Sequence, residues 1–178
     1  MQLFKLIKKT HLTIVSTLVL LMGFAYAEPI GDITEFKGNA TLTREEGDEL
    51  IIGTLPTDPK IEINDTAETA NGRMLIQFLD EAKRSLTENT KVYIDKVYYD
   101  PDPSKSKMTM RMALGTARFA SGRLGMVNKN NIDITTPTAS ITVRGTDFTT
   151  TIDELGRSLV VLLPDENGKP SGVIEVSN

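Results

Sequence analysis

The sequence contains no cysteine and no tryptophan, and its one histidine, His11, falls within the first 27 residues. Beyond that point the chain lacks the side chains on which most zinc sites, thiolate nucleophiles and serine–histidine pairs depend. The phosphate-binding motifs GxxxxGK[ST] and GxGxxG are also missing, so no motif indicates nucleotide binding. We therefore expect no cofactor and no metal site, and the composition favours a binding protein over an enzyme.

Long apolar runs are equally scarce, and the one that exists lies near the N-terminus at residues 12–24. It follows a start with three lysines and no acid, and it leads into Ala-Tyr-Ala, a small-x-small cleavage pattern. The sequence thus predicts a secretory signal peptide over residues 1–27 and one exported domain over residues 28–178. The alternative is an uncleaved anchor, although residues 12–27 are fewer than the roughly 20 that a spanning helix needs.

The chain is acidic. Its formal net charge is −4, and it would be −7 without the three N-terminal lysines. Binding to nucleic acid or to anionic lipid depends on clustered lysine and arginine, and no basic stripe is present. We therefore expect neither nucleic acid nor a membrane surface as a partner.

Short alternations of apolar and polar residues recur through the exported region, separated by turn residues roughly every 8 to 12 positions. The best helix candidate, residues 80–86, has too few apolar residues to form a stripe. The pattern predicts an all-β domain of many short antiparallel strands, arranged as a sandwich, a barrel or a short β-solenoid-like roll. A hairpin is expected where Gly38 and Asn39 separate the runs at 33–36 and 40–43.

The most regular patterning lies in residues 131–152. Apolar and polar residues alternate there in three phases, which change at Pro137 and at Gly145. A period of two marks a half-buried strand, while proline and glycine interrupt strands. We expect three short strands joined by two sharp corners. The apolar side chains of the three phases are Ile132 and Ile134, then Ala139, Ile141 and Val143, then Phe148 and Ile152.

Two blocks in this segment resemble the signature of FecR-type domains, namely Thr136-Pro137-Thr138-Ala139 and Arg144-Gly145-Thr146-Asp147-Phe148. The resemblance implies an all-β domain outside the cytoplasm. In the best-known members that domain passes a signal from an outer-membrane transporter to a cytoplasmic sigma factor, and a cytoplasmic anti-sigma segment precedes a membrane helix. The few residues before the apolar run leave no room for such a segment. The resemblance therefore implies a stand-alone exported domain, whose two blocks are structural or bind a partner.

Arg144 and Asp147 are the charged residues of the second block. An arginine beside a turn glycine, with a carboxylate three residues on, can form a bidentate pair across the corner at Gly145. The first interpretation is a structural clamp between two strands, and the second is a patch that recognises a partner. The neighbouring threonines fit a solvated strand face, namely Thr146, Thr149, Thr150 and Thr151.

Met108, Met110 and Met112 alternate along one expected strand, which places their thioethers and Leu114 on one face. Thioethers can bind Cu(I), but no histidine or cysteine is available to complete such a site. Methionine at this spacing more often fills a core. We expect these side chains to be buried.

Carboxylates offer two further possibilities. Glycoside hydrolysis needs two acids across a cleft, and the possible members are Asp80, Asp95, Asp133, Asp147 and Asp153. With 24 acids in the chain some pairing is inevitable, so this alternative is weak. Separately, Asp100, Asp102 and Ser104 begin like an EF-hand loop, but Lys105 and Arg111 stand where that loop needs glycine and glutamate, which leaves at most a weak surface ion.

The sequence as a whole predicts a non-catalytic, exported binding module of the cell envelope, either periplasmic or on the cell surface. Its expected partner is another envelope protein or a polysaccharide, and its oligomeric state is left open. Two alternatives remain, a membrane-tethered signalling regulator with an uncleaved N-terminus and a carboxylate-based glycan hydrolase.

Overall fold

The computed structural model describes residues 28–54 and 59–178. The expected signal peptide lies outside these residues, and within them no helix is long and apolar enough to cross a membrane. Regular structure is mostly β-strand, which confirms the predicted all-β class. The strands are β1 (Gly31–Lys37), β2 (Ala40–Thr43), β3 (Glu49–Ile51), β4 (Thr66–Thr69), β5 (Arg73–Phe78), β6 (Lys83–Leu86), β7 (Thr90–Tyr98), β8 (Lys107–Ala120), β9 (Ile132–Thr135), β10 (Ser140–Arg144), β11 (Asp147–Ile152), β12 (Ser158–Leu162) and β13 (Val173–Ser177). The helical turns are η2 (Pro103–Lys105), α2 (Arg123–Val127) and η3 (Lys129–Asn131).

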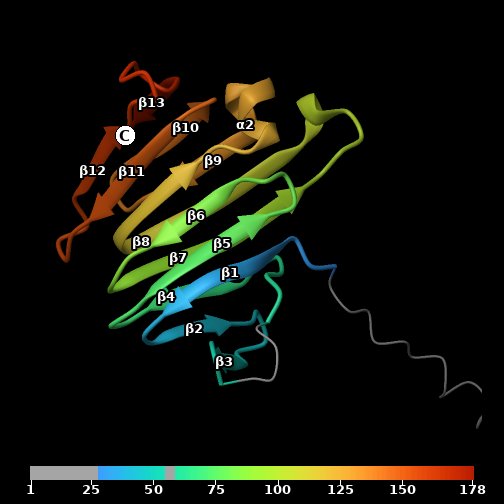
Figure 1. Cartoon of the computed structure of the whole chain (residues 1–178), viewed down its shortest axis with the longest axis vertical. Helices are drawn as coiled ribbons and strands as arrows, with labels where there is room; N and C mark the ends of the chain where they lie inside the picture. The colour runs from blue at the N-terminus through green and yellow to red at the C-terminus, as the bar shows by residue number, and fades with distance from the viewer. Residues whose placement is uncertain (1–27, 55–58) are drawn as a thin grey trace, which may run out of the picture.

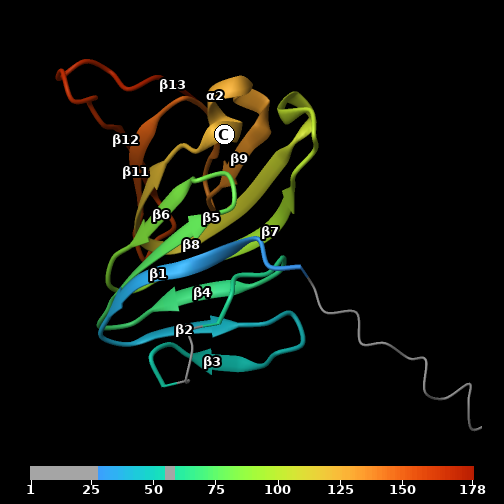
Figure 2. The same ribbon diagram turned by 45° about the vertical axis from the view of Figure 1, so that its right-hand side comes forward.

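The 13 strands form one curled sheet with two branches that share β8 (Figures 1 and 2). One branch has the order β1-β5-β6-β8-β11-β12, and the other has the order β3-β2-β4-β7-β8-β9-β10-β13. Residues 107–114 of β8 pair with β7, whereas residues 117–120 pair with β6. Buried side chains from both branches form a single apolar core.

A glycine allows β8 to bend from one branch into the other. Gly115 has a φ of +89°, a left-handed conformation that side chains with a Cβ rarely adopt. A Cβ at this position would lie 2.4 Å from the carbonyl oxygen of Asn89 and 2.5 Å from the Cα of Thr90. The bend therefore requires glycine both for its backbone angle and for the close approach of residues 89–90.

The methionine face of β8 lies in the core, as the alternation predicts. Met108, Met110 and Met112 are all buried. Leu114, which the alternation places on the same face, is exposed instead. The reason is a bulge, because Lys91 of β7 pairs with Leu114 while the next residue, Val92, pairs with Met112, and a bulge reverses the side-chain phase.

Two features of the strand pairing differ from the predictions. β8 and β9 run parallel, with Met108 opposite Ile132, whereas an antiparallel arrangement is predicted throughout. The chain leaves β8 at the far end and returns through α2 and η3, so β9 starts beside the first residues of β8. The hairpin predicted at Gly38 and Asn39 is also wrong, because β1 pairs with β5 while β2 pairs with β3 and β4, in different branches.

The core contains a charged residue. Arg84 on β6 is 1% exposed, and its guanidinium lies 5.6 Å from the ring centre of Phe78 and 5.1 Å from that of Phe119. Its Nη1 donates to the carbonyl oxygens of Lys83 and Ala120, each at 3.0 Å, while Nε has no hydrogen-bond partner among the described residues. Burial lowers the pKa of Arg84 to about 10.

Candidate interaction surface

The first signature block, residues 136–139, forms the turn between β9 and β10. The backbone N–H of Thr136 donates to the carbonyl oxygen of Ala139 at 2.8 Å, and the N–H of Ala139 donates to Thr136 Oγ1 at 2.9 Å. A threonine side chain that accepts from the backbone in this way stabilises a tight turn. The predicted corner at Pro137, which is exposed, is therefore present.

This turn is attached to the turn between β11 and β12. Thr136 Oγ1 lies 2.7 Å from Ser158 Oγ, and Thr138 Oγ1 lies 2.8 Å from the same atom. Thr138 Oγ1 also donates to the carbonyl oxygen of Gly156 at 3.2 Å. The hydroxyl groups thus join the ends of the two branches, which gives the first block a structural role.

The second block crosses from one branch to the other, and Arg144 and Asp147 do not form the predicted pair. Gly145 has a φ of +58° and turns the chain from β10 to β11. The Asp147 carboxylate accepts from Arg118 of β8, with a distance of 2.9 Å between Nε and Oδ1 and a second bond from Nη2 to Oδ2. These hydrogen bonds raise the pKa of Arg118. The predicted clamp is wrong because the turn places the two side chains on different branches.

The other residues of the second block anchor the corner. The Phe148 ring stacks on that of Phe119, with 5.0 Å between ring centres and 9° between ring planes. The backbone N–H of Thr146 donates to Ser121 Oγ at 3.2 Å, and the Thr146 carbonyl oxygen accepts from the Ser121 N–H at 3.0 Å. Asp147, Phe148 and Thr146 therefore have structural contacts, and Arg144 stands apart from them. The predicted solvated threonine face is wrong for Thr146 and Thr150, which are both buried. Thr150 lies between Phe148 and Ile152 in the alternation of β11, on the side that faces the core.

Arg144 and Asp147 are expected to differ in their effect on stability. Asp147→Asn should lower the free energy of unfolding by at most about 1 kcal/mol, the range of an exposed ion pair, and Arg118→Gln should not add to that loss in the double variant. Arg144→Gln should leave the free energy of unfolding unchanged. Urea unfolding of these four variants and of the Arg144→Gln/Asp147→Asn double variant measures these differences, and a coupling between positions 144 and 147 would contradict the observed pairing.

Arg144 lies within an exposed surface that we call the corner patch, made of Arg144, Met126 and Val173. Val173 of β13 is directly opposite Arg144 on β10, so both side chains lie on one face of the sheet. Met126 follows Gly125, whose carbonyl oxygen accepts from the N–H of Gly145 at 2.9 Å. Figures 1 and 2 both place α2 and β13 at the same end of the molecule.

The corner patch combines apolar surface with an unpaired cation. Met126 is 67% exposed and Val173 is 63% exposed. Arg144 is exposed as well and forms no ion pair among the described residues. Exposed apolar side chains around an arginine are typical of protein-binding surfaces.

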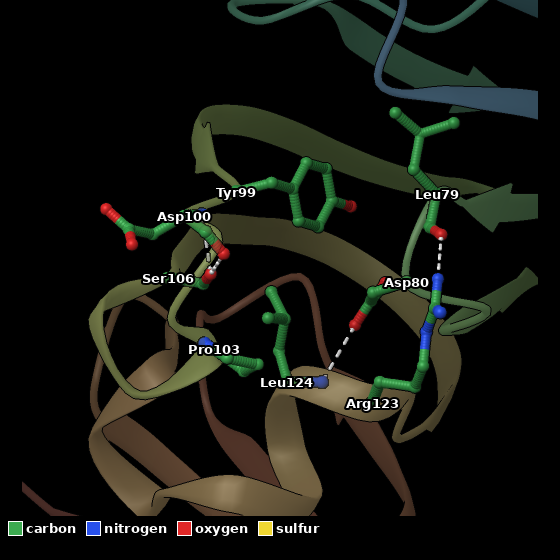
Figure 3. Close-up of a pocket in the computed structure, with 8 residues that line it drawn as sticks. All are labelled: Leu79, Asp80, Tyr99, Asp100, Pro103, Ser106, Arg123 and Leu124. Atoms are coloured by element: carbon green, nitrogen blue, oxygen red, sulfur yellow. Dashed lines mark hydrogen bonds between the residues drawn. The ribbon is translucent and has the colours of Figure 1, made fainter.

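A pocket of about 360 Å³ opens nearby (Figure 3). Asp80 forms its structural centre, because its Oδ1 accepts from the N–H of Ala82 at 3.2 Å and its carbonyl oxygen accepts from the N–H of Arg123 at 2.9 Å. Asp80 thus fixes the turn after β5 to the start of α2. The lining residues are Leu79, Asp80, Tyr99, Asp100, Pro103, Ser106, Arg123 and Leu124.

The polar side chains of this pocket form local hydrogen bonds or are buried. Asp100 Oδ2 accepts from the Tyr98 hydroxyl at 2.8 Å, and its Oδ1 accepts from the N–H of Asp102 at 2.8 Å. The Tyr99 hydroxyl is buried without a hydrogen-bond partner among the described residues, and burial raises the pKa of Tyr99. The pocket therefore resembles a structural junction more than an acid–base site.

The remaining acids proposed for hydrolysis each have a local partner. Asp95 accepts from Arg111 Nε through both oxygens, at 2.9 and 2.8 Å. Asp153 accepts from Arg157 Nε at 2.6 Å. Asp133 accepts from the Ser140 hydroxyl at 3.2 Å. Across residues 28–54 and 59–178, no group of three or more histidine, cysteine or acidic residues could hold a metal ion.

The EF-hand-like segment also forms a turn of its own. Asp102 Oδ1 accepts from the N–H of Ser104 at 3.1 Å and from its hydroxyl at 2.8 Å. This carboxylate thereby caps η2, and these hydrogen bonds lower the pKa of Asp102. The alternating acids are accounted for by the turn.

Fold and surface together describe an all-β domain whose signature residues build a corner. One arginine of that corner, Arg144, is exposed and has no ion pair among the described residues. Comparison with protein families gives a match to FecR protein over residues 65–164, which is more than half of the chain. The chain belongs to the FecR family, which takes part in signalling regulation in the cell envelope. No curated protein and no solved structure matches it.

The sequence predicts the corner at Gly145, but it does not predict which side chains contact each other there. Arg118, the partner of Asp147, lies on a strand 29 residues away, and only the pairing of β8 with β11 brings the two together. Met126 carries no sequence signal as a surface residue, because a short turn of helix has no apolar stripe to read. Arg144 is the charged residue of the two blocks that is exposed and has no ion pair among the described residues.

Proposed function

We propose that this FecR-family chain is a non-catalytic binding module of the cell envelope, and that it recognises another envelope protein through the corner patch. The observation that carries this proposal is the state of Arg144. It is exposed and has no ion pair among the described residues, although the second charged residue of the same motif is bound to Arg118.

The chemistry of the corner patch defines the partner. A free guanidinium offers five donors in a planar fork, which suits a carboxylate. Met126 and Val173 add exposed apolar surface, and methionine adapts its shape to different partners. The expected partner therefore presents an acidic side chain next to apolar ones. A polysaccharide without carboxylates would use neither feature.

The ion pairs support a binding role over hydrolysis. A glycosidase requires one carboxyl group that holds its proton and one that does not, across an open cleft. Asp95, Asp147 and Asp153 instead pair with arginines on neighbouring positions of the sheet or turn. Regulation of signalling, the role of the family, requires recognition of a partner but no chemical step.

Charge reversal at Arg144 should abolish partner binding. We expect the chain with Arg144→Glu to bind its envelope partner at least about thirtyfold more weakly, the loss typical of a central interface arginine, with an unchanged unfolding curve. The measurement is co-migration of the tagged chain with larger complexes in a gently solubilised envelope extract.

The matched control is Arg73→Glu, which reverses an exposed arginine on β5 that pairs with Glu88. This variant should retain the complex. Retention of the complex by the Arg144→Glu variant, or an equal loss in both variants, would contradict the proposal.

Export is the second part of the proposed function. We expect intact-mass measurement of separated cell fractions to find a soluble species that begins at Glu28, because cleavage is expected after Ala27. A full-length species in the inner membrane would contradict export and would favour the membrane-tethered regulator.

A further inference from the structure

The side of β12 that faces away from β11 is an unprotected strand edge. Among the strands in residues 28–54 and 59–178, β12 pairs only with β11, and it lies at the left margin of the sheet in Figures 1 and 2. The N–H of Asp153 donates to the carbonyl oxygen of Arg157, and the N–H of Leu163 donates to that of Asp147. The backbone N–H and C=O groups of the odd-numbered residues in this stretch, such as Leu159 and Val161, therefore face β11. The backbone groups of Ser158, Val160 and Leu162 point away from the sheet.

Another edge of the sheet, β1, carries devices that oppose the pairing of strands between molecules. β1, the edge at the opposite end of the same branch, contains Asp32, Glu35 and Lys37 and has a register shift after Ile33. β12 reads Ser-Leu-Val-Val-Leu and contains no charge, proline or bulge. Its outward side chains are apolar too, since Leu159 is 61% exposed and Val161 is 43% exposed.

The edge is complementary to itself. If two copies of β12 run antiparallel with Val160 at the two-fold axis, Leu159 of each copy lies directly opposite Val161 of the other. A two-fold axis requires this kind of self-complementary pattern.

We propose that the chain forms a symmetric homodimer by antiparallel pairing of β12 with β12 of a second copy. The pairing joins the two sheets and satisfies the outward backbone groups of Ser158, Val160 and Leu162. It leaves the corner patch of each copy free, because Arg144, Met126 and Val173 are not on the β12 edge. The dimer would therefore present two corner patches to its partners.

Sedimentation equilibrium of the purified chain from residue 28 onward tests this proposal. The wild-type chain is expected to pass from monomer to dimer as its concentration rises from about 1 µM to about 1 mM. Val161→Lys should raise the dimer dissociation constant at least about tenfold, since lysine on an edge strand opposes pairing. Val176→Lys is the matched control, because it makes the same change on β13, another edge strand of the sheet, and should have no effect.

A charge-complementation experiment fixes the register. Leu159→Glu alone should also weaken self-association, whereas an equimolar mixture of the Leu159→Glu and Val161→Lys chains should form heterodimers. In the proposed register the carboxylate introduced at position 159 faces the ammonium introduced at position 161. A wild-type chain that stays monomeric, an equal loss in the Val176→Lys control, or a mixture that does not associate would each overturn the homodimer. Arg144→Glu should leave dimerisation unchanged, so the outcome is independent of the proposed partner binding.

Discussion

Replacement of Arg84 by alanine is expected to lower the free energy of unfolding by about 3 kcal/mol, while replacement by methionine is expected to keep it within about 1 kcal/mol of the wild type. Alanine leaves a cavity between the rings of Phe78 and Phe119. Methionine restores most of the side-chain volume and removes a buried cation that has no carboxylate within ion-pair distance among the described residues. Volume, rather than charge, should therefore determine the contribution of Arg84.

The pH dependence provides an independent test of the same residue. Burial lowers the pKa of Arg84 to about 10, below the value of arginine in the unfolded chain. Between those two values the unfolded state binds more protons, so the contribution of Arg84 to stability rises with pH above about 10 and is constant below it. Relative to the Arg84→Met chain, the wild type should gain stability between pH about 8 and pH about 11.

Chemical denaturation of the three chains at both pH values measures these differences. A methionine variant that is less stable than the wild type by about 3 kcal/mol would show that the charge itself stabilises the core. The stacking on two phenylalanine rings would then outweigh the loss of hydration.

The second large effect is expected at the bend of β8. Gly115→Ala should lower the free energy of unfolding by more than about 3 kcal/mol. The new Cβ would lie 2.4 Å from Asn89 O and 2.5 Å from Thr90 Cα, and backbone atoms cannot move aside without disturbing β7. The left-handed backbone angle adds to this cost.

Gly145→Ala is the matched control for that experiment. Gly145 also has a positive φ, of +58°, but no atom lies within 4 Å of the position that its Cβ would occupy. The free energy of unfolding of the Gly145→Ala chain should fall by only about 1–2 kcal/mol, the cost of the backbone angle. Equal losses at positions 115 and 145 would contradict the close approach of the β8 bend to β7.

Local patterns predicted those parts of the fold that depend on neighbours in sequence. The three phases of residues 131–152 become β9, β10 and β11, and Ile134, Val143 and Phe148 are buried in the core as expected. The turn at Pro137 is equally local, because its hydrogen bonds join Thr136 to Ala139. Alternation and turn chemistry are properties of short segments and can be read without the fold.

Features that depend on pairing between distant strands could not be predicted. The local pattern predicts an ion pair between Asp147 and Arg144, three residues away. Asp147 instead binds Arg118, because β11 lies beside β8. Arg84 gave no sign of burial, since its neighbours Lys83 and Ser85 are polar and the strand around it is short. The parallel pairing of β8 and β9 depends on the return through α2, which no local pattern encodes.

A photo-crosslink from the edge of the corner patch tests whether this patch binds an envelope protein. A photoreactive amino acid at position 126 in living cells should give one discrete adduct with an envelope protein, which disappears when Arg144→Glu is added. The same probe at Ile51, an exposed residue of β3 at the far end of the molecule in Figure 1, should give no adduct that depends on Arg144. The absence of an adduct at position 126, or an adduct that persists unchanged with the Arg144→Glu substitution, would contradict binding through the corner patch.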